Sequence, residues 1–303
     1  MDLLIGFVTI LVVIAAGAGL AQARILNGDS LRTLGEIAFF VASPALMIVT
    51  IGAVSLDAAV PNLVASTLAL AVCFVAYVVL ARLRWSPHTG SLLIGGLASS
   101  YVNAGNLGIA IAAYVVGDIT IVVPTLLIQM LLVQPLALMV LDRHTGRGKG
   151  TWAVLRPIVA NPLTISAVIG VVLAVTGADL PEVVDAPLRL LGGAAIPLML
   201  MSYGAALRLS PPVGRAGHNG EVLLATALKM LVMPVVAWAI ASALGMEGRV
   251  LLGVVITAAL PTAQNIFLHA TRYRVGEDVA RESILITTLA SLPAALLVAF
   301  VLG

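Results

Sequence analysis

Residues 101–108 read Tyr-Val-Asn-Ala-Gly-Asn-Leu-Gly, which places two asparagines and two glycines inside a long apolar segment. Asparagine and glycine are both poor residues for a helix interior, so we expect the helix to break here. Leucine and valine surround the stretch on both sides. A polar break in so apolar a setting indicates a special place in the fold.

The whole chain is far more apolar than a soluble domain. Of its 303 residues 61% are hydrophobic and 10% are charged, and the mean hydropathy is +1.12. Apolar segments long enough to cross a hydrocarbon core of about 30 Å as helices recur along its length. We predict an all-α integral membrane protein with ten transmembrane helices. The predicted spans are 3–23, 34–54, 61–83, 91–116, 119–141, 158–177, 187–207, 221–244, 250–271 and 280–302.

Basic residues indicate the orientation of these spans. With the N-terminus outside, most of the 16 Lys and Arg residues fall in inward-facing connections, whereas Arg189 and Arg249 fall in outward ones. Cytoplasmic connections carry such an excess of positive charge. We therefore expect a multi-pass protein of the cell (plasma) membrane with both termini outside.

The two halves of the chain share a pattern. Matched positions lie 159 residues apart, and a second set, which includes Pro135 and Pro293, lies 158 apart. The first set pairs Asn106, Tyr114, Gly117 and Asp118 with Asn265, Tyr273, Gly276 and Glu277. Because five spans are an odd number, the second copy enters the membrane from the opposite side. We predict a 5+5 inverted repeat, with residues 1–141 and 158–303 as the repeats and 142–157 as a cytoplasmic linker.

Inverted repeats are typical of secondary transporters, whose substrate sites lie near the midplane at interrupted helices in corresponding positions. The fourth span is interrupted by the quoted stretch, and the ninth by Leu260-Pro-Thr-Ala-Gln-Asn265. Asn103 can cap the restarted fourth helix with Asn106 three residues on, and Gly105 permits positive φ. Pro261 suits the first turn of the restarted ninth helix. Two helix N-termini would then attract an anion.

These features give a set of candidate substrate-binding residues. Amides in membrane helices also serve simple helix packing, and that alternative applies to each asparagine taken alone. Lys229, a charge inside a span, either supplies an ammonium to a carboxylate or extends toward the interface. The candidates are Asn103, Gly105, Asn106, Pro261, Gln264, Asn265 and Lys229, with Ser99 and Ser100 as secondary ones.

The sequence gives little indication of a disulfide, a metal site, an enzyme active site or a proton relay. The single cysteine, Cys73, permits no intramolecular disulfide and no cysteine metal cluster. No His-Glu-x-x-His or Gly-x-Ser-x-Gly motif occurs, so an intramembrane enzyme is a remote alternative and no cofactor or metal is expected. Acidic residues fall in connections or at span ends, which leaves no evident proton relay. Export of an anion from an inside-negative cell needs no proton relay, because the membrane potential favours that movement.

Two stretches, Tyr101-Val-Asn-Ala-Gly-Asn-Leu-Gly-Ile and Leu260-Pro-Thr-Ala-Gln-Asn-Ile-Phe, together with Leu228-Lys-Met-Leu-Val-Met-Pro234, resemble the auxin efflux carrier family. The resemblance covers essentially the whole chain. It implies fourth and ninth helices that cross at their breaks, and organic-anion transport by elevator-like movement of a crossover domain against a scaffold that often forms a homodimer. The short linker resembles bacterial malonate or malate carriers of the family more than plant auxin exporters.

A sodium-coupled, bile-acid-like symporter is the main alternative, because such proteins also have crossed, broken helices. They are expected to place acidic and amide groups around sodium, whereas neither break here contains a glutamate. The partners we expect are a small carboxylate and the lipid bilayer, with no nucleic acid.

Overall fold

The computed structural model describes residues 2–52, 59–144, 160–209 and 218–303, in which every named element is a helix. This part of the chain contains six helices that are long and apolar enough to cross a membrane. Four shorter apolar helices fall within the remaining predicted spans. The predicted all-α membrane fold is confirmed, while the inverted repeat stays a prediction. Most of the predicted linker, 145–157, lies outside the described residues.

The chain divides into two compact units that are interleaved in sequence. Unit 1 comprises Met1–Ala59, Gly105–Val123 and Pro157–Pro211, and unit 2 comprises Val60–Ala104, Pro124–Arg156 and Pro212–Gly303. Each unit therefore takes segments from both halves of the chain. The unit boundaries therefore differ from the boundaries of the predicted repeats.

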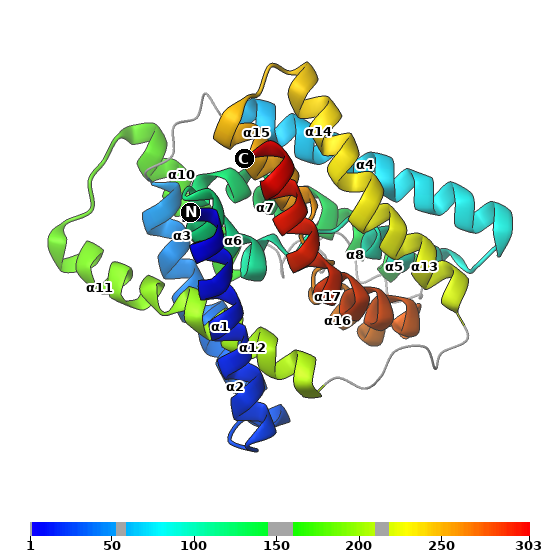
Figure 1. The fold of residues 1–303 in the computed structure, drawn as a ribbon, viewed down its shortest axis with the longest axis horizontal. Coiled ribbons are helices and arrows are strands. Elements are labelled where there is room, and N and C mark those ends of the chain that lie inside the picture. The colour runs from blue at the N-terminus through cyan, green and yellow to red at the C-terminus, as the bar shows by residue number, and fades with distance from the viewer. Residues whose placement is uncertain (1, 53–58, 145–159, 210–217) are drawn as a thin grey trace. The chain divides into compact units, whose positions relative to one another are not determined.

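Three pairs of helices make the closest contacts in unit 1. Helix α1 packs along α12 (Figure 1), and α3 packs against both α10 and α11. The bounds are α1 Asp2–Gln22, α2 Gly28–Ile37, η1 Ala38–Ala42, α3 Ser43–Ile51, α6 Ile109–Ile111, η3 Ala112–Val116, η4 Ile119–Val122, α10 Pro162–Thr176, α11 Glu182–Gly193 and α12 Ala195–Leu209. The π-helix η2, Ala104–Gly108, begins at the boundary with unit 2.

Glycines bring the backbones of α1 and α12 together. A Cβ atom on Gly17 would lie 2.1 Å from the Met201 carbonyl oxygen, and one on Gly204 would lie 1.9 Å from that of Ile14. Small residues at helix crossings let backbones approach closely, which is how helices associate in lipid without a hydrophobic driving force.

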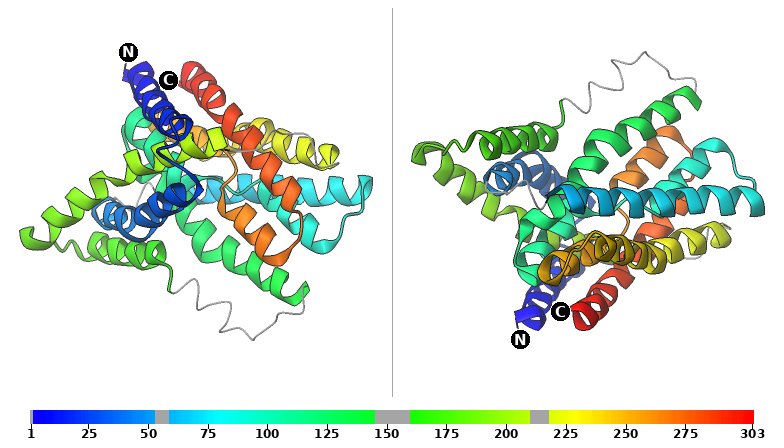
Figure 2. Two further views of the ribbon diagram at one scale, coloured as in Figure 1. Left: turned by 90° about the horizontal axis from the view of Figure 1, so that it is seen from below. Right: turned by 90° about the horizontal axis from the view of Figure 1, so that it is seen from above.

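Unit 2 contains both interrupted helices. Its elements are α4 Ala59–Arg84, α5 Thr89–Ala98, α7 Val123–Ile128, η5 Gln129–Val133, α8 Gln134–His144, α13 Asn219–Ala227, η6 Leu228–Val232, α14 Met233–Ala243, α15 Gly248–Ala258, α16 Asn265–Tyr273 and α17 Glu277–Leu302. Figure 2 shows α4 beside the long helix made of α13, η6 and α14, and buried Tyr77 and Leu228 share a core cluster there. Tyr273, at the end of α16, donates a hydrogen bond of 2.6 Å to Asp142 of α8.

Candidate functional site

The helical backbone is interrupted at two places in unit 2, and the two interruptions pair with each other. Helix α5 ends at Ala98 and α15 at Ala258, and a β-bridge joins Val102 to Thr262. The Asn103 N–H donates to the Pro261 carbonyl at 2.8 Å, and the Ala263 N–H donates to the Tyr101 carbonyl at 3.1 Å. Backbone groups that the breaks release are thus satisfied by residues about 160 positions away in the sequence.

Side chains from two further helices complete this pairing. Gln129 of η5 accepts the Val102 N–H with Oε1 and donates from Nε2 to the Val102 carbonyl at 3.0 Å. Thr287 of α17 accepts the Thr262 N–H at 3.1 Å. Both supporting side chains are buried, and they lie 158 residues apart, the offset found for the prolines of the same two helices.

The serines at the first break serve the end of α5. The hydroxyls of Ser99 and Ser100 each donate to the Gly96 carbonyl at 2.7 Å, and the Thr262 hydroxyl donates to the Ala98 carbonyl. Unpaired carbonyls at a helix C-terminus are commonly satisfied in this way. The structure therefore gives Ser99 and Ser100 a local structural role.

Lys229 serves the end of the other interrupted helix. It is fully buried, and its Nζ donates to the carbonyl of Ala258, the last residue of α15, at 2.7 Å. The Met233 sulfur lies 3.3 Å from the same atom. An ammonium at a helix C-terminus is favourable because that end carries partial negative charge. Lys229 thus contacts a helix end rather than an asparagine.

Two amide atoms at the paired segments have no hydrogen-bond partner in the described structure although they are buried. They are Nδ2 of Asn103, whose side chain is 4% exposed, and Oδ1 of Asn265. Asn265 begins α16. Buried polar atoms normally find partners, so two free ones at one place indicate a ligand or water site.

Two expectations about local geometry are wrong. Gly105 belongs to the π-helix η2 and is not among the glycines with positive φ. Pro261 precedes α16 by four residues, so it takes part in the backbone pairing instead of the first helical turn. Asn103 pairs through its backbone N–H and directly precedes η2, so its role as a cap stays a prediction. Paired segments satisfy backbone groups that the breaks release, and the first break needs no left-handed geometry at Gly105.

The remaining candidates differ in position. Gln264, the N-cap residue of α16, is exposed and makes no side-chain capping bond. Asn106 lies in η2 in the part of the chain that belongs to unit 1, and its side chain is outside the described residues. The described site therefore consists of Asn103, Pro261, Gln264 and Asn265, with Lys229 behind the break of α15.

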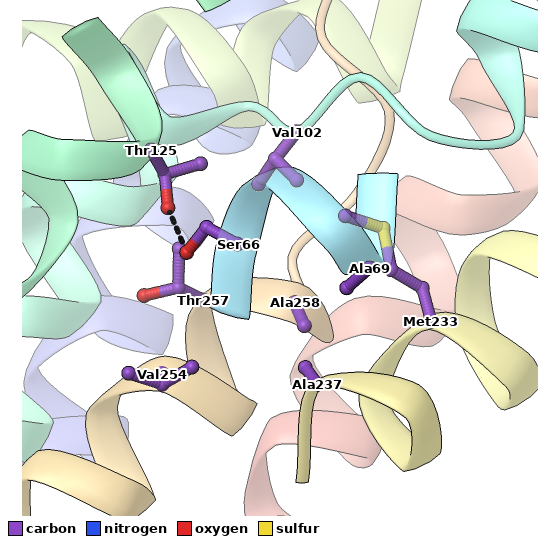
Figure 3. Close-up of a pocket in the computed structure, with 9 residues that line it drawn as sticks. All are labelled: Ser66, Ala69, Val102, Thr125, Met233, Ala237, Val254, Thr257 and Ala258. Atoms are coloured by element: carbon purple, nitrogen blue, oxygen red, sulfur yellow. Dashed lines mark hydrogen bonds between the residues drawn. The ribbon is translucent and has the colours of Figure 1, made fainter. Parts of the chain in front are cut away.

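A small pocket lies on the Val102 side of the paired segments (Figure 3). Its hydroxyls are already used, because Thr125 donates to Ser66 at 2.8 Å, Ser66 to Asn62 at 3.0 Å and Thr257 to the Gly253 carbonyl at 2.7 Å. The free space is close to that of a single water molecule. This pocket is too small for a carboxylate. It is lined by Ser66, Ala69, Val102, Thr125, Met233, Ala237, Val254, Thr257 and Ala258.

Sequence reasoning missed several residues that shape this unit. One of them is Gln129, which binds an unwound backbone segment at Val102. The shared offset between Gln129 and Thr287 was the available signal. Two carboxylates at span ends, Glu221 and Glu282, are also buried; Tyr77 donates to Glu221 at 3.4 Å, and Arg281 pairs with Glu282 at 3.3 Å.

Known proteins resemble this chain. A family model described as "Membrane transport protein" matches residues 3–299. The chain is similar to the probable auxin efflux carrier component 1b of Oryza sativa subsp. japonica, with 28% identity over 154 residues, which are 50% of this chain and 28% of the rice protein. It is also similar to auxin efflux carrier component 3 of Arabidopsis thaliana, with 27% identity over 154 residues, 50% of this chain and 24% of that protein. The matched region spans about a quarter of these relatives.

Proposed function

Since the chain belongs to the membrane transport protein family, which is the family of the auxin efflux carriers, we propose that it is a secondary transporter that exports a small organic anion, a carboxylate. The family is the one predicted from the two interrupted segments. Its members are transporters, which points away from an enzyme. The substrate and the direction are proposals.

The observation that carries the proposal is the pair of free amide atoms at the joined breaks. Asn103 Nδ2 is a buried hydrogen-bond donor without a partner in the described residues, and it suits a carboxylate oxygen. Helix α16 begins at Asn265, so its N-terminal end adds partial positive charge at the same break. An anion at this place would satisfy both.

Lys229 supports an anion site at the breaks through its charge rather than by direct contact. Its partners among the described residues are the Ala258 carbonyl and the Met233 sulfur, and neither is an anion. A buried ammonium without a carboxylate leaves a positive field at the breaks, which favours an anionic substrate. In carriers of this type a half-helix C-terminus often binds sodium. Here the lysine occupies that end of α15.

We assign the movement to the two units. Unit 2 holds the paired breaks and would act as the crossover domain, while unit 1 would act as the scaffold in an elevator-like, alternating-access cycle. The proposed fold has ten helices in a 5+5 inverted repeat, in which the fourth and ninth helices cross. We propose further that both termini lie outside and that the scaffold forms a homodimer. Support for the repeat comes from Gln129 and Thr287, which serve equivalent backbone positions in the two breaks.

Transient currents from proteoliposomes on a solid-supported membrane test the proposal. Jumps of mono- and dicarboxylates in sodium-free buffer should displace charge, and Asn265→Ala should reduce the signal at least about tenfold by removing an amide from the break. Asn219→Ala, an exposed asparagine at the start of α13, is the matched control and should behave as wild type. Charge movement that requires sodium would instead indicate a sodium-coupled symporter.

A further inference from the structure

The helix made of η5 and α8 contains a π-helical turn beside the first break. This turn begins at Gln129, and Gln134, directly before Pro135, donates its N–H to the Gln129 carbonyl five residues back. An α-helix would use the carbonyl four residues back. Gln129 is also the residue whose side chain binds the backbone N–H and carbonyl of Val102.

The helix made of α13, η6 and α14 has the same feature beside the second break. Met233, directly before Pro234, donates its N–H to the Leu228 carbonyl, again five residues back. The Cys73 thiol of α4 donates to that carbonyl as well, at 3.6 Å. The turn contains Lys229, whose Nζ donates to the end of α15. Each break is therefore supported by a side chain from a π-helical turn that a proline follows.

The prolines disfavour the α-helical alternative at these turns. A proline lacks an N–H, and in an α-helix its ring clashes with the carbonyl four residues back. The π-helix η1 precedes Pro44 with the same hydrogen-bond pattern, whereas α17 stays α-helical across Pro293. Proline alone therefore does not produce a π-helical turn, but at Pro135 and Pro234 it opposes closure of the turn. Such turns are rare and are frequently found at functional sites.

A π-helical turn fixes the rotation of the two parts of a helix relative to each other. It contains one residue more than an α-helical turn, and each residue of an α-helix adds a rotation of about 100°. The other ends of both helices are anchored, because Tyr273 donates to Asp142 of α8 at 2.6 Å and Tyr77 donates to Glu221 of α13 at 3.4 Å. Closing either turn would therefore rotate its polar side chain away from the break.

We propose that Pro135 and Pro234 are positioning residues, which stabilise the π-helical turns and thereby direct one polar side chain to each break. Through Pro135 this side chain is the amide of Gln129, which binds the unwound segment at Val102. Through Pro234 it is the ammonium of Lys229, whose charge favours an anion. The role of Pro234 rests on the proposed function, whereas the role of Pro135 does not depend on any substrate.

Hydrogen exchange and a double-mutant cycle in the purified full-length protein test Pro135. Alanine favours the α-helix, so the turn can close in Pro135→Ala, and the Val102 amide should exchange at least about fivefold faster, as in Gln129→Met. Gln129→Met should raise the unfolding equilibrium constant about fivefold or more in wild type, but less than about twofold in Pro135→Ala. A proline with only a structural role would give equal ratios in both backgrounds and leave the Val102 amide protected.

Carboxylate affinity, measured by isothermal titration calorimetry with lactate, benzoate and malonate, tests Pro234. For each probe that wild-type protein binds, Pro234→Ala should weaken binding about tenfold, as Lys229→Met does. Adding Pro234→Ala to Lys229→Met should weaken it less than about twofold further. Pro293→Ala, which alters a proline of unit 2 in a continuous helix, is the matched control and should bind as wild type.

The outcomes separate this inference from the proposed function. A Val102 amide that stays protected in Pro135→Ala overturns the role of Pro135. Affinity losses that multiply in the Pro234→Ala, Lys229→Met double variant overturn the role of Pro234 and leave carboxylate binding standing. Absence of binding by all three probes overturns the proposed function and the role of Pro234, while hydrogen exchange still decides the role of Pro135.

Discussion

At the scale of single residues, polar groups in unit 2 divide into those that repair the backbone and those that remain free. Ser99, Ser100 and Thr262 donate to carbonyls at the end of α5, and Lys229 does so at the end of α15. Asn103 and Asn265 each keep a free amide atom. Unsatisfied buried groups cost about 1–3 kcal/mol each, so they are retained where a ligand or water meets them.

Replacing Lys229 by methionine tests its electrostatic role. A unit charge acting over roughly 10 Å at an effective dielectric constant of about 20 is worth about 1.7 kcal/mol. At that scale, Lys229→Met should weaken carboxylate binding about tenfold or more. Stability should change little, since removing a buried charge offsets the loss of the Ala258 bond. Affinity by isothermal titration calorimetry and the Tm provide the two readouts.

Met233→Leu is the matched control for that variant. It alters the other group that contacts Lys229 Nζ while leaving the ammonium and its bond to Ala258 in place. Affinity near that of wild type is expected. An unchanged affinity in Lys229→Met itself would show that the ammonium serves only the end of α15.

The sequence identified the residue types at the breaks but not their partners. Asn103 and Asn265 were found because polar groups stand out in apolar spans. Pro261 was assigned to the first turn of a helix and Gly105 to left-handed backbone, which are local solutions. The actual solution is non-local, because backbone of one segment pairs with the other. A single sequence carries no direct signal for such a contact.

At the scale of elements, unwound segments are held by side chains from neighbouring helices. Gln129→Met keeps side-chain length but leaves the Val102 N–H without a partner, while the Val102 carbonyl still accepts the Ala104 N–H at 2.8 Å. A buried unsatisfied group costs about 1–3 kcal/mol, so the free energy of unfolding should fall by about 1–3 kcal/mol. Chemical unfolding of the purified protein, followed by circular dichroism, measures the change.

Gln22→Met makes the same replacement at an exposed site and is the matched control for Gln129→Met. Gln22 accepts a hydrogen bond from Arg208 at 2.6 Å in an exposed setting, where water can replace the lost partner. We expect a change within about 0.5 kcal/mol. A similar loss in both variants would remove the special role of Gln129.

At the crossing of α1 and α12, two glycine-to-alanine substitutions should change stability in opposite directions. In Gly17→Ala the new Cβ would lie 2.1 Å from the backbone oxygen of Met201, so the helices must separate and stability should fall by about 1–3 kcal/mol. In Gly19→Ala nothing lies within 4 Å, and alanine should stabilise α1 by about 0.5–1 kcal/mol. Tm values of the two variants in one detergent provide the comparison. Equal shifts would contradict the close crossing.

Helix positions were predictable because long apolar segments leave few alternatives in lipid, and the structure has an apolar helix in every predicted span. Compact units were not predictable from the repeat pattern. Unit 1 joins α1 to α12 and α3 to α10 across the two halves, and those contacts depend on small residues such as Gly204 rather than on sequence order.

At the scale of the whole molecule, a carrier that exports an anion without a coupling ion should follow the membrane potential. One negative charge moving outward gains about 2.3 kcal/mol per 100 mV, which corresponds to roughly a 50-fold outside-to-inside ratio at equilibrium. In the described structure the buried Lys229 occupies the end of α15, where a coupling cation would otherwise bind. Proteoliposomes loaded with a transported carboxylate and held inside-negative by a potassium gradient with valinomycin should therefore lose it in sodium-free buffer. Loss that ignores the potential, or that begins only when sodium is added, would contradict uncoupled export.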